Sequence, residues 1–85
     1  MYMDKKLIGY VISSEARRKV LRFLLDKGPS RPVQIAEKLP YDQPYVTRSL
    51  QGLEKKRLVE CLTPKKKAWR VYAISDLGRD LLSKL

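Results

Sequence analysis

The sequence predicts a small α+β domain that is mostly α-helical. Three observations support this prediction. Apolar side chains recur at helical spacing in residues 34–39 and 46–53, on either side of a short turn that contains a proline. Two short segments with strand character, 59–62 and 69–74, then flank a lysine-rich loop. A last amphipathic stretch covers residues 75–85. A three-helix core, a short β-hairpin wing and a C-terminal helix together make a winged helix-turn-helix.

The length and charge of the chain narrow its class. Eighty-five residues fit a single domain, 1–85, with one modest core. The formal net charge is +10. Between residues 43 and 70, eight Lys and Arg stand against two Glu, a local net charge of +6. Such a concentration favours a polyanionic partner, with an ordinary solvated surface as the alternative.

The N-terminal segment, residues 1–12, is too apolar for an idle tail. We expect it either to close the core behind the first helix or to cover a partner. The first helix is predicted over residues 13–27, where Ser13 or Ser14 can serve as its N-cap and Gly28 ends it. Its expected core stripe is Ala16, Val20, Phe23 and Leu24, with Leu21 at the margin.

The second helix is predicted over residues 32–39, after a very short strand at Ser30 and Arg31. Pro32 suits the first turn of a helix, where amides have no intrahelical partner. The apolar stripe of this helix is Ile35, Ala36 and Leu39. Pro40 should end the helix, because proline lacks an N–H and disfavours the α conformation of the residue before it.

The third helix, 43–57, is the candidate recognition helix. Asp42 can cap it, and Val46, Leu50 and Leu53 form a buried stripe whose end the stem of Arg57 can cover. Gly52 inside a helix suggests a close neighbour, either DNA or the first helix. The opposite face carries side chains suited to the major groove of DNA. These are Pro44, Thr47, Arg48, Gln51 and Lys55.

The hairpin, 59–74, is the predicted wing. Lys65, Lys66 and Lys67 repel one another at its tip, which favours contact with phosphates or the minor groove over a role in solubility or edge protection. Alternation places Tyr72 and Ile74 on one face of a return strand that starts at Trp69. Trp69 itself could flank DNA, cover the N-terminal segment or lie in a dimer interface.

The final helix is predicted over residues 75–85, with Ser75 as its N-cap and a stripe of Leu77, Leu81 and Leu85. Both ends of the chain thus carry apolar residues that a small domain can hardly bury alone. We therefore expect a symmetric homodimer, with a monomer whose N-terminal segment crosses its own first helix as the alternative. The residues assigned to this surface are Leu7, Ile8, Tyr10, Val11, Ile12, Leu77, Leu81, Leu82 and Leu85.

The stretches IAEKL and YVTRSLQGLEKKRLVE, with the later Tyr72–Gly78 segment, resemble small prokaryotic winged-helix regulators of the MarR/ArsR type. The likeness spans residues 14–85 and departs from the family pattern at Arg57, where a glycine usually ends the recognition helix. It implies a transcriptional regulator that binds double-stranded DNA. The expected DNA-binding residues are Gln43, Pro44, Tyr45, Thr47, Arg48, Gln51, Lys55, Lys65, Lys66, Lys67 and Arg70.

Other functions find little support in the sequence. Without histidine and with the single Cys61, the chain lacks the residues of most catalytic and metal sites, so we expect no enzyme, cofactor, metal or evident effector site. Cys61 fits plain packing better than a redox sensor. No stretch approaches a membrane span or a signal peptide, which favours a cytoplasmic, nucleoid-associated protein. A winged-helix protein-interaction module and a non-specific, chromatin-like DNA binder stay as alternatives.

Overall fold

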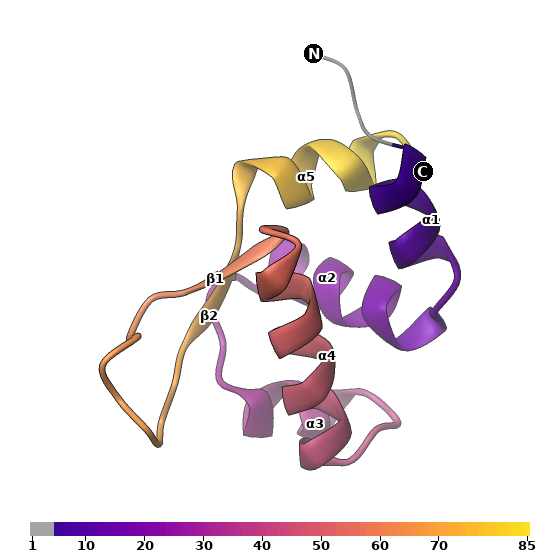
Figure 1. Ribbon diagram of the computed structural model, residues 1–85. Coiled ribbons are helices and arrows are strands. Elements are labelled where there is room, and N and C mark those ends of the chain that lie inside the picture. Colours follow the sequence, from indigo (N-terminus) through magenta and orange to yellow (C-terminus); the bar gives the residue numbers. More distant parts are fainter. Residues whose placement is uncertain (1–4) are drawn as a thin grey trace.

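A computed structural model describes residues 5–85, within which five helices accompany a two-stranded antiparallel sheet (Figure 1). The expected fold class is confirmed: three helices, a hairpin and a C-terminal helix follow one another in the predicted order. The elements are α1 (Lys5–Ile12), α2 (Glu15–Lys27), α3 (Pro32–Lys38), α4 (Gln43–Lys55), β1 (Val59–Cys61), β2 (Tyr72–Ile74) and α5 (Asp76–Ser83).

Side-chain caps fix where the helices start. Ser14, rather than Ser13, caps α2 by accepting a hydrogen bond from the Arg17 amide, so the helix begins two residues later than predicted. Ser75 caps α5 by accepting from the Gly78 amide, and α5 therefore begins at Asp76. Helix α3 ends at Lys38, and the predicted last residue, Leu39, is its C-cap.

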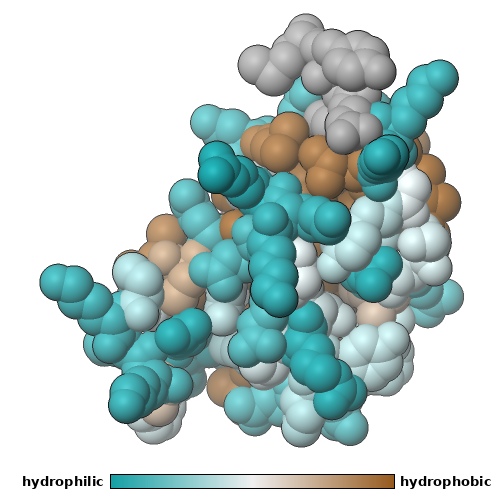
Figure 2. All heavy atoms as spheres, in the orientation of Figure 1, coloured by the Kyte–Doolittle hydropathy of each residue, from teal (hydrophilic) through white to brown (hydrophobic). Residues whose placement is uncertain are grey.

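One hydrophobic core joins α2, α3, α4, α5 and the sheet. The predicted stripe of α4 is fully buried, as are Ile35 of α3 and both Tyr72 and Ile74 of β2. In α2 the prediction was wrong at one position: Leu21 is fully buried and Phe23 lies at the margin, half-buried. In Figure 2 hydrophilic side chains spread over α4 and the wing, whereas hydrophobic ones gather where α1 and α5 approach each other.

The N-terminal segment, for which no helix was predicted, forms α1 and packs against α2. Residues 1–4 of that segment lie outside the described residues. Val11 is completely buried and Leu7, Ile8 and Tyr10 pack partly against the core, so α1 closes the core from behind. The Tyr10 hydroxyl also approaches Gly52 so closely that a Cβ there would collide with it. The neighbour that explains Gly52 is therefore α1, neither DNA nor the first predicted helix.

The recognition helix ends earlier than predicted, because α4 stops at Lys55 and not at Arg57. Arg57 adopts a left-handed backbone with φ of 63°. Its amide donates to the Glu54 carbonyl, and the Leu58 amide donates to the Leu53 carbonyl. This pair of bonds is a Schellman motif, in which glycine is the usual residue at the left-handed position. Arg57 is exposed, so its stem does not cover the end of the buried stripe as expected.

The hairpin is shorter than predicted. Strands β1 and β2 pair antiparallel with Val59 opposite Ile74, and Ser30 adds a single bridge to Tyr72 in place of the expected short strand. The return strand starts at Tyr72, so the prediction of a strand from Trp69 was wrong. Trp69 has a φ of 61°, which no strand residue adopts.

The C-terminal helix also ends earlier than predicted, at Ser83. Leu85 therefore lies beyond the helix and is exposed, while Leu82 is buried beside Leu81. Val11, Leu81 and Leu82, which the sequence assigned to a dimer surface, are thus core residues of a single chain. The apolar surface left at this end of the molecule is smaller than expected.

Candidate nucleic-acid interface

Helix α4 presents a polar and cationic face to solvent because its other face is held in the core. The carboxylate of Asp42 accepts a hydrogen bond from the Tyr45 amide at 2.9 Å and fixes the start of the helix. With the apolar stripe buried, the side chains between its rows point outward. Thr47 is half-buried, and the predicted residues of this helix that are exposed are Gln43, Pro44, Tyr45, Arg48, Gln51 and Lys55.

Three aromatic and cationic side chains gather at the first turns of α4. The rings of Tyr41 and Tyr45 lie 5.4 Å apart, and the guanidinium carbon of Arg48 lies 5.9 Å from the centre of the Tyr45 ring. Tyr41 in turn donates a hydrogen bond to Glu15 at the start of α2. These contacts give the turn before α4 and the Arg48 side chain a defined position.

Hydrogen bonds within the wing shape its loop, residues 62–71. Leu62 donates to the Val71 carbonyl at 2.7 Å, and the Val71 amide donates to the Thr63 hydroxyl at 3.1 Å. At the tip, Nε of Arg70 donates to the Lys66 carbonyl at 2.8 Å. Arg70 therefore holds the loop closed, while Lys65, Lys66 and Lys67 stay exposed.

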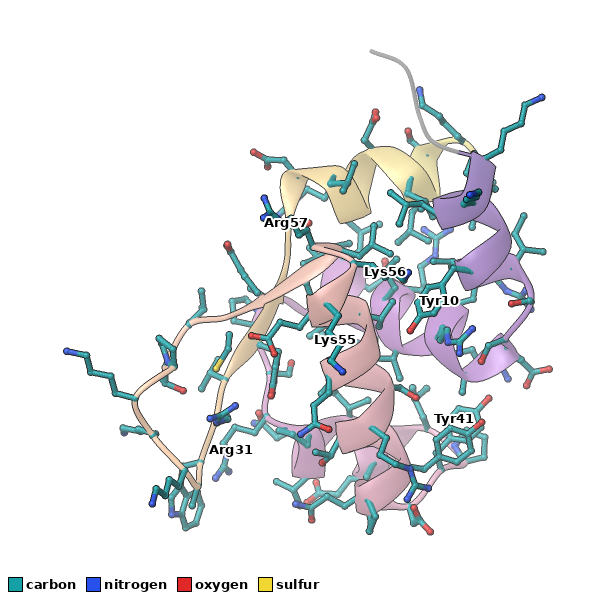
Figure 3. All side chains as sticks on the ribbon, in the orientation of Figure 1. Tyr10, Arg31, Tyr41, Lys55, Lys56 and Arg57 are labelled. Atoms are coloured by element: carbon teal, nitrogen blue, oxygen red, sulfur yellow. The ribbon has the colours of Figure 1, made fainter. Side chains whose placement is uncertain are left out.

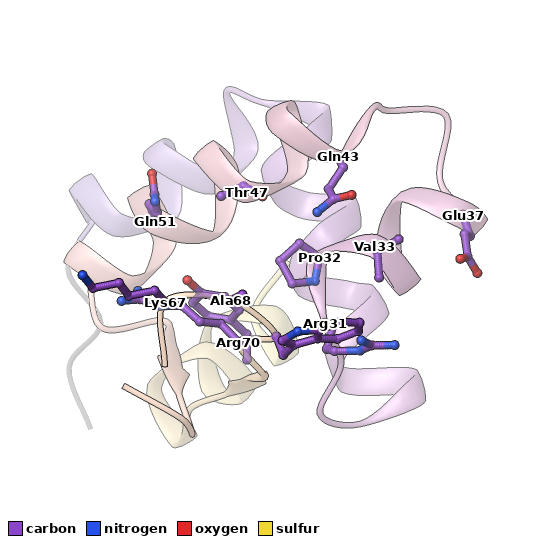
Figure 4. Close-up of a pocket in the computed structure, with 12 residues that line it drawn as sticks. Arg31, Pro32, Val33, Glu37, Gln43, Thr47, Gln51, Lys67, Ala68 and Arg70 are labelled. Atoms are coloured by element: carbon purple, nitrogen blue, oxygen red, sulfur yellow. The ribbon is translucent and has the colours of Figure 1, made fainter. Parts of the chain in front are cut away.

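A groove of about 940 Å³ separates α4 from the wing (Figure 4). Gln43, Thr47 and Gln51, one helical turn apart, form one wall, and Lys67 and Arg70 line the other. The start of α3 closes one end. The remaining lining residues are Arg31, Pro32, Val33, Glu37, Ala68, Trp69 and Tyr72. Five of the eleven predicted binding residues thus share one groove.

The other predicted residues lie around this groove. Arg48 and Lys55 line a second, shallower hollow of about 500 Å³ together with Gln51 and Arg70. Figure 3 shows the Lys55 side chain on the solvent side of α4. The structure does not bring Pro44, Tyr45, Lys65 and Lys66 into either hollow.

Two groove residues were absent from the predicted site, Arg31 and Trp69. The guanidinium carbon of Arg31 lies 4.7 Å from the centre of the Trp69 ring. Arg31 directly precedes Pro32, and a cation at a predicted helix start beside a basic wing was a usable signal. Trp69 gave a weaker signal, because strand alternation placed its side chain without revealing the turn in the backbone.

Three ionisable groups near this surface have shifted pKa values. The neighbouring Tyr72 hydroxyl raises the pKa of Arg70, which keeps its guanidinium charged. The hydrogen bond from Lys19, 3.0 Å away, lowers the pKa of Glu15. Partial desolvation, followed by the charge of Glu15, raises the pKa of Tyr41, so its hydroxyl keeps its proton as a donor.

Among residues 5–85, no helix is long and apolar enough to cross a membrane. Within the same residues, no three or more Cys, Asp or Glu side chains come together as a metal site would require.

Two solved structures share this fold. The chain matches BpsR from Bordetella bronchiseptica with a TM-score of 0.76 and 22% identity, over 84% of this chain and 55% of that one. That structure concerns the regulation of BpsR DNA binding by 6-hydroxynicotinic acid. RV1404 from Mycobacterium tuberculosis matches with a TM-score of 0.76 and 21% identity, over 91% and 55%. The chain thus spans little more than half the length of either protein.

A sequence model of a regulatory family also matches. Searched against curated proteins, the chain finds no match. The model of the bacterial regulatory protein, arsR family, matches residues 14–60, which include the whole of α2, α3 and α4. That span is more than half of the 85 residues. The chain therefore belongs to the ArsR family of bacterial regulatory proteins and is a DNA-binding domain of a transcriptional regulator.

Proposed function

We propose that the chain regulates transcription by placing α4 in the major groove of double-stranded DNA, with the wing on the neighbouring backbone or minor groove. One observation carries the proposal: the polar face of α4 and the basic wing line the same groove. An α-helix fits the width of the major groove, where base edges offer donors and acceptors. The exposed face of α4 supplies complementary groups from Gln43 to Lys55.

Within this proposal Arg48 is the best candidate for a base contact. Its guanidinium is exposed and lies over the Tyr45 ring, which limits the orientations it must give up on binding. Arginine can donate two parallel hydrogen bonds to O6 and N7 of guanine, a pairing that discriminates between bases by about 1–3 kcal/mol. Gln43, Tyr45, Thr47 and Gln51 would face neighbouring base edges, with Pro44 and Lys55 at the two ends.

The wing would bind through charge. Lys65, Lys66, Lys67 and Arg70 are cations on one short loop, and neutralising phosphates with them releases counterions. Each phosphate contact steepens the salt dependence of binding by roughly 0.9 in the slope of log K against log salt. The wing thus contributes affinity with little sequence preference, while α4 contributes the sequence preference.

We also propose that the protein acts as a symmetric homodimer joined at its ends. Support comes from apolar side chains that stay partly or largely exposed where α1 and α5 meet: Leu7, Ile8, Ile12, Leu77 and Leu85. Two-fold symmetry would place two copies of α4 about 34 Å apart, the spacing of successive major grooves on one face of DNA. In sedimentation equilibrium, a dimeric mass that Ile12→Glu with Leu85→Glu abolishes supports this arrangement. A mass near 9.9 kDa would sink it.

The proposal gives the protein a binding role alone, at the nucleoid in the cytoplasm, with no catalytic group, cofactor or effector. The regulation of BpsR by 6-hydroxynicotinic acid belongs to that protein, and its likeness to this chain concerns the fold. The groove beside α4 is assigned here to DNA.

A titration of labelled duplexes over a salt series, read by fluorescence anisotropy, tests the proposal. Binding should weaken linearly on the logarithmic plot as salt rises. Arg48→Ala should remove the preference at one base pair and leave non-specific affinity nearly unchanged, while the control Arg79→Ala, an exposed cation on α5, should change neither. A uniform loss with Arg48→Ala makes it a phosphate contact. An absence of binding at low salt would favour a protein-interaction module instead.

A further inference from the structure

Trp69 is placed where its own fold gains little from it. The side chain is 70% exposed, the largest exposed fraction among the large hydrophobic residues of the described chain. Its backbone has a φ of 61°, a left-handed conformation that is strained for a bulky residue. Exposed apolar surface and backbone strain both act against stability, and such strain is typical of functional positions. A binding partner would account for both features.

Arg31 meets Trp69 from the other side of the groove. Its amide donates to the Gln34 side chain at 2.8 Å, which fixes the backbone at the start of α3. Its guanidinium extends to the Trp69 ring, 4.7 Å from the ring centre. Arg31 takes part in neither of the ion pairs that residues 5–85 show, Lys19 with Glu15 and Lys84 with Asp80. The guanidinium therefore keeps N–H groups to offer an anion.

The groove between them has the charge of a site for a polyanion. Arg31, Lys67 and Arg70 line it against a single carboxylate, Glu37, a net charge of +2. Its walls also include the amides of Gln43 and Gln51 and the hydroxyl of Thr47. One flat aromatic ring beside several cations suits a chain that alternates phosphates with apolar sugars or bases.

We infer that Arg31 and Trp69 form a clamp on one sugar-phosphate strand of the duplex, and this inference rests on the proposed function. With α4 in the major groove and the wing over the adjacent backbone, the strand between the two grooves must pass through the space that separates α4 from the wing. Arg31 donates to a phosphate of that strand. Trp69 leaves the guanidinium and packs its ring against the adjoining deoxyribose.

The two halves of the clamp predict different signatures. Arg31→Ala removes one phosphate contact and lowers the slope of log K against log salt by roughly 0.9. Trp69→Ala removes an uncharged contact, so affinity falls about tenfold at every salt concentration and the slope stays unchanged. Trp69→Phe keeps a ring and most of the affinity. Arg79→Ala serves as the control for loss of one positive charge.

Trp69 is the single tryptophan of the chain, so its fluorescence reports on the clamp directly. The test measures quenching by acrylamide, a neutral quencher, in the full chain alone and saturated with duplex, while anisotropy of the labelled duplex measures binding. The free protein should be quenched strongly, and saturation should lower the quenching constant several-fold. Circular dichroism confirms that each variant is folded, which the exposure of Trp69 favours.

The outcomes separate the clamp from the proposed function. A duplex that binds while Trp69 stays as accessible as before, with Arg31→Ala behaving like Arg79→Ala, overturns the clamp and leaves DNA binding intact. A Trp69 already shielded in the free protein overturns it as well. No binding of the duplex at low salt overturns the proposed function and the clamp with it.

Discussion

Replacing Arg57 with glycine should stabilise the protein, because Arg57 occupies the left-handed position that ends α4. A residue with a Cβ pays roughly 1–2 kcal/mol for that conformation. Glycine avoids this cost but makes the unfolded chain more flexible, which takes back about 0.4–1 kcal/mol. The net expectation is a gain of about 0.5–1 kcal/mol. For a domain of this size that corresponds to a rise in Tm of about 3–6 °C.

Thermal unfolding followed by far-ultraviolet circular dichroism measures this gain. Arg57→Ala is the matched control, since it removes the same charge beside Lys55 and Lys56 but keeps a Cβ at the strained position. The two hydrogen bonds from Arg57 and Leu58 to the carbonyls of α4 are backbone bonds, so both variants can keep them. Equal stabilisation by glycine and alanine would make charge repulsion the cause. A lower Tm with glycine would refute the backbone argument.

Three further predictions concern the two close-packed glycines and the wing. Gly78→Ala should destabilise by about 1–3 kcal/mol, measured by denaturant unfolding, because its Cβ would meet the Leu58 carbonyl and lie 2.8 Å from Ile74; an unchanged midpoint contradicts this packing. Gly52→Ala should stabilise α4 by up to about 1 kcal/mol only when Tyr10→Phe has removed the colliding hydroxyl, so a double-mutant cycle without coupling would count against the close approach. Alanine at the three wing lysines should lower the salt slope of DNA binding by roughly 0.9 for each phosphate that is no longer neutralised, and a folded variant with the original slope would remove the wing from the interface: Lys65, Lys66 and Lys67.

Features that depend on neighbouring residues in the sequence could be predicted. The Asp42 cap and the stripe of Val46, Leu50 and Leu53 follow from side-chain chemistry and helical spacing, and the structure has both. The exposed face of α4 follows from the same spacing, since a helix with one face in the core must present the other.

Features that depend on tertiary packing or on backbone conformation could not. Helix α1 was missed because Gly9 lies in its middle and its apolar residues gave no cap signal. The exchange of Leu21 and Phe23 depends on which neighbours cover the edges of α2. Arg57 and Trp69 have positive φ angles, and neither residue type signals that conformation in a sequence. The groove itself joins α3, α4 and the wing, which spacing along the chain cannot bring together.

The central claim is that the exposed face of α4 and the wing bind duplex DNA, and heteronuclear NMR of the full chain tests it most directly. Backbone amide shifts recorded during a titration with duplex at low salt should change along α4 from Gln43 to Lys55 and in the wing loop, with α5 unaffected. Changes confined to α1 and α5, or no change at saturating duplex, would contradict the claim.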